Sequence, residues 1–227
     1  MKALVNSILP YEALENLSRF AEPVPFSTRG IVPEPLAGHV DIFCTKVDGK
    51  MVLAPNTPKH VVEIMEKAGM DLVFGNTEVT GETETMWAYN VMVDEKFCVC
   101  NADFIDPVLK GMFSERKTVH VRQGFARCSA VSLGGAVMTS DGGIAKALDD
   151  NNIQNILISQ EGITLPGYRN GCFGGACGAC GDKVFIAGNL RHHKQGREIR
   201  DFIGKNGFMA VELSDSPLLD VGSMIFF

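Results

Sequence analysis

The sequence predicts a mixed α/β fold in which five ββα units close into a pseudo-symmetric ring, forming a single domain over residues 1–227. Three observations predict it. One strand–strand–helix pattern recurs along the chain, the recurrence keeps a near-constant period, and each chain end holds part of a unit. The pattern is an apolar strand, a tight turn, a second apolar strand that ends in a small polar residue, a helix and a short strand.

The clearest copy of this unit begins near residue 39. The segments 39–43 and 51–56 read as a strand pair, and the Asp-Gly sequence between them is typical of a hairpin turn. Residues 58–69 carry apolar side chains at helical spacing, and 70–74 reads as the short last strand. Three further copies have their first strands at 88–93, 128–133 and 175–183.

The chain ends supply the fifth copy. Residues 223–227 read as a first strand with nothing after it, and residues 1–6 as a second strand with nothing before it, followed by a helix over 11–20. The polar residues that end the second strands lie 40 to 50 residues apart, and 44 apart when counted through the chain ends; they are Asn6, Asn56, Asn101, Asp141 and Asn189. This spacing favours a ring closed by pairing of the terminal strands. The alternative is an open, mostly parallel sheet, which also alternates strands and helices.

Composition excludes several classes of protein. The net charge is −6 and the basic residues are scattered, so no nucleic-acid partner is expected. No apolar run approaches the ~18 residues of a membrane span, and the first residues lack the zones of a signal peptide. Seven cysteines, an odd number, favour reduced thiols in the cytoplasm. We expect a small-molecule partner and no cofactor, while the oligomeric state is left open.

Three residues are candidates for catalysis: His39, Cys128 and Asp220. Each lies at or just before the first strand of its unit. In a ring of like units, equivalent positions converge at one end of the central axis. A thiol, an imidazole and a carboxylate that meet there form a nucleophile, a base and an orienting group. Arg127 is expected on the opposite strand face from Cys128. Taken singly, each candidate has an ordinary structural explanation, as a buried thiol, a satisfied histidine or a turn residue.

These segments resemble the pentein superfamily of guanidine-modifying enzymes, and most closely dimethylarginine dimethylaminohydrolase and arginine deiminase. Residues 38–56 are similar to the segment around the family's catalytic histidine, a His-Leu-Asp/Lys strand followed by a hairpin. Residues 123–133 are similar to the segment around its nucleophilic cysteine, and 218–227 to its Asp/Glu-Gly-Gly-Asp strand. The resemblance implies a five-unit propeller with Cys128 as nucleophile, His39 as acid and base, and Asp220 as the residue that orients the histidine. The acidic strand comes last here and first in the family, which implies a circular permutation.

The resemblance implies a cysteine-dependent hydrolase or transferase that acts on an amidine-like carbon–nitrogen group. The family grips guanidinium with further acidic residues, but the corresponding stretch here, 170–184, offers only Asp182. Arginine-like substrates are therefore not expected. The alternative is a non-catalytic binding module, as in the ribosome anti-association factor that shares the ring. A thiol far from His39, or a plugged cavity, would favour that alternative.

A cysteine-rich segment offers a different function. Cys172, Cys177 and Cys180 have the C-x4-C-x2-C spacing of a plant-type [2Fe–2S] ferredoxin. No cysteine follows to supply the fourth ligand, although one from elsewhere in the fold, or His192 or His193 for zinc, would complete a site. We expect no metal and interpret the segment as small residues that pack closely.

Overall fold

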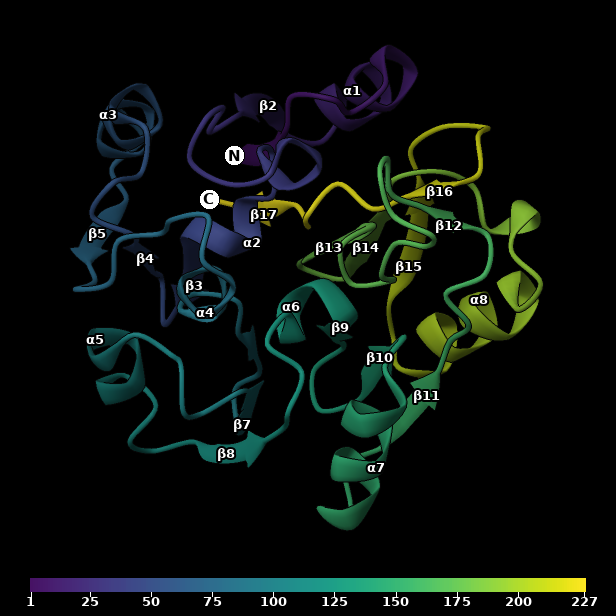
Figure 1. Ribbon diagram of the computed structural model, residues 1–227. Coiled ribbons are helices and arrows are strands. Elements are labelled where there is room, and N and C mark those ends of the chain that lie inside the picture. Colours follow the sequence, from purple (N-terminus) through teal and green to yellow (C-terminus); the bar gives the residue numbers. More distant parts are fainter.

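The computed structural model describes residues 1–227, and its strands fall into six small sheets (Figure 1). Five are three-stranded, and in each the central strand has an antiparallel neighbour on one side and a parallel neighbour on the other. The sixth pairs β12 (Ile163–Thr164) with β16 (Leu218–Leu219) in parallel. No sheet closes on itself, because the strands are divided among separate sheets. The mixed α/β class is confirmed.

Four of the three-stranded sheets are built from continuous segments, each in the order hairpin, helix, parallel strand. They are β3 (Cys44–Val47), β4 (Lys50–Leu53), α3 (Lys59–Lys67) and β5 (Asp71–Phe74); β6 (Met92–Val93), β7 (Phe97–Cys100), α5 (Pro107–Gly111) and β8 (Lys117–His120); β9 (Ala130–Ser132), β10 (Val137–Thr139), α7 (Gly142–Asp150) and β11 (Asn155–Leu157); and β13 (Cys177–Cys180), β14 (Lys183–Ile186), α8 (Gly196–Lys205) and β15 (Met209–Glu212). The β3–β4 turn is formed by Asp48 and Gly49, both at positive φ, as a two-residue hairpin of this twist requires.

The two ends of the chain together form the fifth three-stranded sheet. β17 (Ile225–Phe226) pairs antiparallel with β1 (Lys2–Asn6), and α1 (Tyr11–Ser18) then leads to β2 (Glu22–Phe26), parallel to β1. Leu4 lies opposite Ile225 in this pairing. The prediction that the terminal strands complete one unit is confirmed.

Two predicted strand starts are short helices. The first strands predicted at 39–43 and 128–133 begin later, and α2 (Val40–Phe43) and α6 (Ala126–Ser129) precede β3 and β9. All four residues of α2 are buried, so alternation could not reveal its conformation. A short apolar run of this kind fits a strand and a buried helical turn equally well. The remaining short helices are α4 (Thr83–Trp87), η1 (Glu34–Leu36) and η2 (Leu190–His192).

The four longest helices lie at the periphery, and the short helix α5 lies there too (Figure 1). The four are α1, α3, α7 and α8, whereas α2, α6, β13 and β17 surround the centre (Figure 1). The largest hydrophobic cluster contains 29 buried residues and includes Val40, Ile42 and Phe43 of α2, which anchors that turn at the centre. None of the helices is both long enough and apolar enough to span a membrane.

Candidate active site

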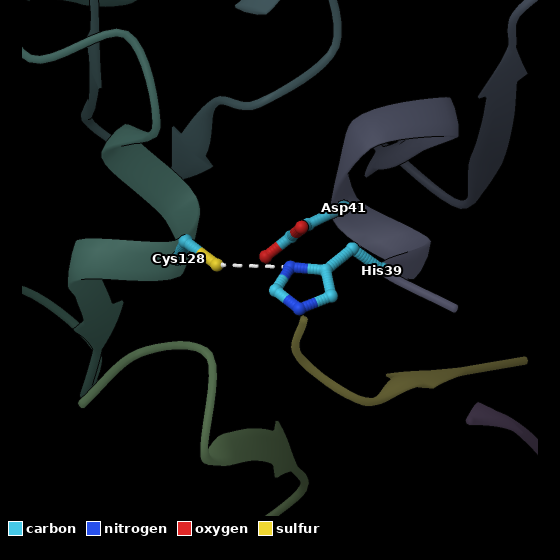
Figure 2. A group of neighbouring side chains, drawn as sticks. All are labelled: His39, Asp41 and Cys128. Carbon is cyan, nitrogen blue, oxygen red and sulfur yellow. Dashed lines mark hydrogen bonds between the residues drawn. The ribbon is translucent and has the colours of Figure 1, made fainter. Parts of the chain in front are cut away.

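The structure brings together the three residues that were predicted to be catalytic, His39, Cys128 and Asp220. The Cys128 Sγ lies 3.6 Å from His39 Nδ1 and 3.8 Å from Asp220 Oδ1. The His39 Nε2 lies 4.0 Å from the same Asp220 oxygen and has no hydrogen-bond partner. Figure 2 shows the Cys128 thiol on α6 facing the imidazole at the start of α2. A sulfur and an imidazole nitrogen at this distance can exchange a proton.

Asp220 is held by the backbone rather than by the imidazole. Its Oδ1 accepts a hydrogen bond from the Gly222 N–H at 3.0 Å, and its Oδ2 accepts one from the Cys172 N–H at 2.7 Å. The 4.0 Å separation from His39 Nε2 exceeds hydrogen-bond length. Asp220 therefore places a carboxyl group of fixed orientation beside both the thiol and the imidazole.

Asp41 is a fourth member of the site, and the sequence analysis did not nominate it. Its carboxylate lies beside the thiol and the imidazole (Figure 2), with ligating atoms of His39, Asp41 and Cys128 all within 4.8 Å of one another. The Asp41 Oδ2 accepts a 2.6 Å bond from Ser223 Oγ, whereas Oδ1 is buried without a partner. The signal was present in the His-x-Asp sequence of 39–41. By residue type, this group also has ligands that a zinc ion accepts.

Ser223 adopts an uncommon backbone conformation to reach Asp41. Its φ is +70°, and it is the one fully buried residue among the three non-glycine residues at positive φ, the others being Asp48 and Asn152. Such a conformation persists only where the surroundings impose it, and it is common at functional sites. The hydrogen bond from Ser223 therefore holds Oδ2 of Asp41 in place, and it leaves Oδ1 without a partner in the site.

Asn90 joins the two short helices that carry the site. Its Oδ1 accepts hydrogen bonds from the backbone N–H groups of Arg127, at 2.7 Å, and Cys128, at 3.2 Å. Its Nδ2 donates to the Asp41 carbonyl at 3.1 Å. Asn90 is fully buried, so no water replaces these bonds. The position of the Cys128 thiol relative to the Asp41 carboxylate therefore depends on the side-chain amide of Asn90.

Replacing Asn90 with alanine is expected to lower the free energy of unfolding by about 3 kcal/mol, because buried backbone groups lose their partners. The measurement is urea denaturation. Asn151→Ala is the control: its amide bonds only the Ala147 carbonyl on a partly exposed helix end, and we expect a loss of about 1 kcal/mol or less. Equal losses in the two variants would show that Asn90 does not join the helices.

Burial raises the pKa of the Cys128 thiol well above its ordinary value, and the negative charges of Asp220 and Asp41 raise it further. Burial also raises the pKa of Asp220, although the charge of His39 and the N–H groups of Cys172 and Gly222 oppose this shift. Without a bound cation, the thiol is therefore protonated at neutral pH. A cation placed between the carboxylates would stabilise the thiolate.

The raised pKa of Cys128 gives a direct pH prediction. Alkylation requires the thiolate, so the rate at which neutral chloroacetamide labels Cys128 should still be increasing above pH 9, beyond the range of an ordinary thiol. Peptide mass spectrometry across pH 6–10.5 measures this rate for Cys128 separately from the other cysteines. A rate that reaches its plateau below pH 8 would contradict the assigned direction.

The site is closed to solvent in this structure. His39 and Asp220 are 1% exposed, Asp41 is fully buried and Cys128 is 4% exposed. None of these four residues lines any of the five principal surface cavities. A substrate therefore needs a local opening to reach the thiol.

The cysteine-rich segment does not assemble a metal site. The single group of three or more ligand-type side chains within ligating distance is that of His39, Asp41 and Cys128. Cys177 and Cys180 lie three residues apart on strand β13, so they point to opposite faces. Cys172 instead lies beside the site, where burial raises its pKa to about 11. The iron–sulfur interpretation is not supported by this geometry.

Two other expectations need correction, one about Arg127 and one about the carboxylates of the site. Arg127 is not on a strand; it lies on α6, and its guanidinium donates to the carbonyls of Ala130, Gly174 and Cys177. Asp182 is exposed and pairs with its neighbour Lys183 at the surface. The expectation that the site lacks a further carboxylate is also wrong, because Asp41, from a different segment, lies within it.

Comparison with known proteins identifies both a family and a fold. A family model described as "Family of unknown function (DUF6873)" matches residues 4–225. No curated protein matches the sequence. The structure is similar to C. jejuni agmatine deiminase, with a TM-score of 0.56 and 11% identity over 92% of this chain and 77% of that chain. It is also similar to dimethylarginine dimethylaminohydrolase from Pseudomonas aeruginosa, in a cysteine-to-serine mutant complexed with citrulline, with a TM-score of 0.50 and 12% identity over 92% and 85% of the two chains. The resemblance to the pentein superfamily is confirmed at the level of fold.

Proposed function

This chain belongs to the family of unknown function DUF6873, and from its site we propose that it is a cysteine-dependent hydrolase or transferase acting on an amidine-like carbon–nitrogen group. The observation that carries the proposal is the 3.6 Å approach of Cys128 Sγ to His39 Nδ1 between two buried carboxylates. The fold shared with a deiminase and a dimethylaminohydrolase agrees with it. Cys128 is the nucleophile, His39 the acid and base, and Asp220 the carboxyl group beside the imidazole.

Asp41 defines the kind of substrate. Two buried carboxylates with no lysine or arginine bonded to them form an unfavourable arrangement unless a further positive group enters. A planar amidinium carries its charge on N–H groups that can donate to carboxylate oxygens, and the unpartnered Asp41 Oδ1 is an acceptor for one of them. The substrate is therefore a cation with an amidinium or guanidinium group.

The reaction follows from these positions. The amidinium charge favours ionisation of the thiol, whose proton passes to His39 Nδ1. Sulfur then attacks the central carbon, a carbon–sulfur bond forms, and the C=N electron pair moves to nitrogen. The electron pair on nitrogen then re-forms the C=N bond while the carbon–nitrogen bond to the leaving amine breaks and His39 returns the proton to that amine. Water, or an acceptor amine in a transferase, next attacks the same carbon while His39 removes its proton. This second adduct re-forms a double bond from carbon to nitrogen and expels Cys128 as the thiolate, which recovers the proton from His39.

A pair of alkylating reagents tests this function. Chloroacetamidine and chloroacetamide have nearly the same shape, but only the amidine is a cation at neutral pH. We expect chloroacetamidine to label Cys128 at least about tenfold faster, because one charge-assisted hydrogen bond is worth that factor. Peptide mass spectrometry locates the label, and His39→Gln should slow it. Labelling of other cysteines with Cys128 unmodified would count against the proposal.

The closed site favours the second candidate, a non-catalytic binding module on the same fold. Cys128 is 4% exposed, and a site that never opens performs no chemistry. The same reagents separate the two functions. A binding module leaves Cys128 unlabelled at pH 7 by both reagents while the partly exposed Cys180 reacts.

We also propose that the five three-stranded sheets are the units of a pentein-type propeller forming a single domain over 1–227, in a circularly permuted order. The pairing of β17 with β1 supports this arrangement, because the acidic segment around Asp220 then continues into the first unit through the chain ends.

A further inference from the structure

A surface cavity is lined by elements that also carry the candidate active site, at residues outside that site. Its volume is about 320 Å³, and it is lined by residues of β3, α6 and β17 and by residues around β6 and β13. Several of these elements surround the centre of the molecule in Figure 1. His39 and Asp41 precede the cavity residues Cys44–Lys46, and Asp220 and Ser223 precede Met224–Phe226. The cavity is therefore distinct from the thiol site, whose side chains do not line it.

Two cations and no carboxylate line this cavity. The cations are Lys46 and Arg127, and neither forms an ion pair. Acidic residues line the adjoining cavity instead, where Asp48 pairs with Arg116 and Asp94 accepts bonds from Ser132 Oγ and the Gly135 N–H. The positive charge of the Lys46–Arg127 cavity is thus without a counter-ion inside it.

Both cations keep hydrogen-bond donors free. The guanidinium of Arg127 has five N–H groups, and three are bonded to carbonyls at 3.1–3.2 Å. The Lys46 ammonium has three, and one donates to the Phe226 carbonyl at 2.9 Å. These carbonyl bonds hold the two side chains in place. The remaining donors have no partner in the protein.

Part of the remaining lining is apolar. Eight of the twelve lining residues are hydrophobic, and of these Ala179 is exposed and Val93 and Cys180 are partly exposed. A strongly hydrated inorganic anion would gain nothing from these walls, whereas an apolar chain would be removed from water. We propose that this cavity binds a small organic anion: its carboxylate accepts bonds from Lys46 and Arg127, and its short alkyl chain packs against the apolar wall.

Calorimetric titration with hexanoate tests the proposal. Acetate supplies the carboxylate without the chain, and hexylamine the chain without the carboxylate. We expect hexanoate to bind at one site per chain, acetate to bind at least about tenfold more weakly because several methylenes are lost, and hexylamine not to bind. Absence of hexanoate binding, or equal binding of hexylamine, would overturn the proposal.

Variants locate the bound anion. Lys46→Gln should weaken hexanoate binding about tenfold or more through loss of a charge-assisted bond. Lys50→Gln is the matched control, because Lys50 pairs with Asp71 outside the cavity, and it should bind as the unmodified protein does. Ala179→Phe places a ring in the cavity from an exposed position and should also prevent binding. Unchanged binding in both Lys46→Gln and Ala179→Phe would refute the site. Chloroacetamidine labelling of Cys128 should be unaffected in Lys46→Gln. Labelling of Cys128 therefore tests the proposed catalytic function, and hexanoate binding tests the anion site independently of it.

Discussion

Asp41→Asn is expected to remove the preference of Cys128 for a cationic reagent. The substitution keeps the size of the side chain and replaces a buried negative charge with a neutral amide. Chloroacetamidine then loses a charge-assisted partner, and its rate of labelling at pH 7 should fall by about tenfold to a hundredfold. The rate for neutral chloroacetamide should not fall, because removal of a negative charge beside the thiol favours its ionisation.

The matched control for Asp41→Asn is Asp182→Asn. Asp182 is the acid that the sequence offered for recognition of a cation, but it lies on the surface beside Lys183. Its removal should leave both labelling rates unchanged. If Asp182→Asn lowers the amidine rate and Asp41→Asn does not, the assignment of the cation-binding carboxylate is wrong.

Gly222→Ala is expected to be the most destabilising small substitution in the site. Gly222 has a φ of +69°, and a Cβ there would lie 2.3 Å from the Cα of His39 and 2.2 Å from its Cγ. The backbone of α2 would have to move, which costs about 1–3 kcal/mol for overpacking, in addition to about 1 kcal/mol for the positive φ. We therefore expect the free energy of unfolding to fall by about 3 kcal/mol in urea denaturation, together with loss of chloroacetamidine labelling.

Two further glycine variants separate the effect of the close contact with His39 from the effect of the positive φ. Gly69→Ala has nearly the same φ, +77°, but open space around the Cβ, so it should lose only about 1 kcal/mol. Gly204→Ala, within α8 and also in open space, should be neutral or stabilising by about 0.5–1 kcal/mol. A loss at Gly222 no larger than that at Gly69 would mean that its close contact with His39 has no energetic weight.

Much of the fold could be predicted from the sequence because its units repeat. Each hairpin has a turn with Gly, Asp or Lys, and the polar residues that end the second strands recur at a regular spacing. The pairing of the terminal strands followed from half-units at the two ends, and β1 and β17 do pair. The conformation of residues 40–43 could not be predicted, because four consecutive buried residues carry no periodicity.

The site was predictable in part for the same reason. His39, Cys128 and Asp220 occupy corresponding places in three units, and this repetition together with the family resemblance indicated that they would lie close together. Their side chains lie within 4.0 Å of one another. Asp41 was not predicted as a site residue because residues 39–43 were expected to form a strand and the acids that bind a cation were expected in 170–184. Ser223 and Asn90 act through contacts between distant segments, 182 and 49 residues from Asp41, which no local pattern encodes.

The most direct measurement is a crystal structure of the protein after reaction with chloroacetamidine. We predict continuous density from Cys128 Sγ to the reagent's methylene carbon, with the amidinium nitrogens at hydrogen-bond distance from Asp41 and near Asp220. The imidazole of His39 should remain beside the sulfur. An adduct on Cys180 or Cys172 with Cys128 unmodified, or an amidinium directed away from both carboxylates, would contradict the account.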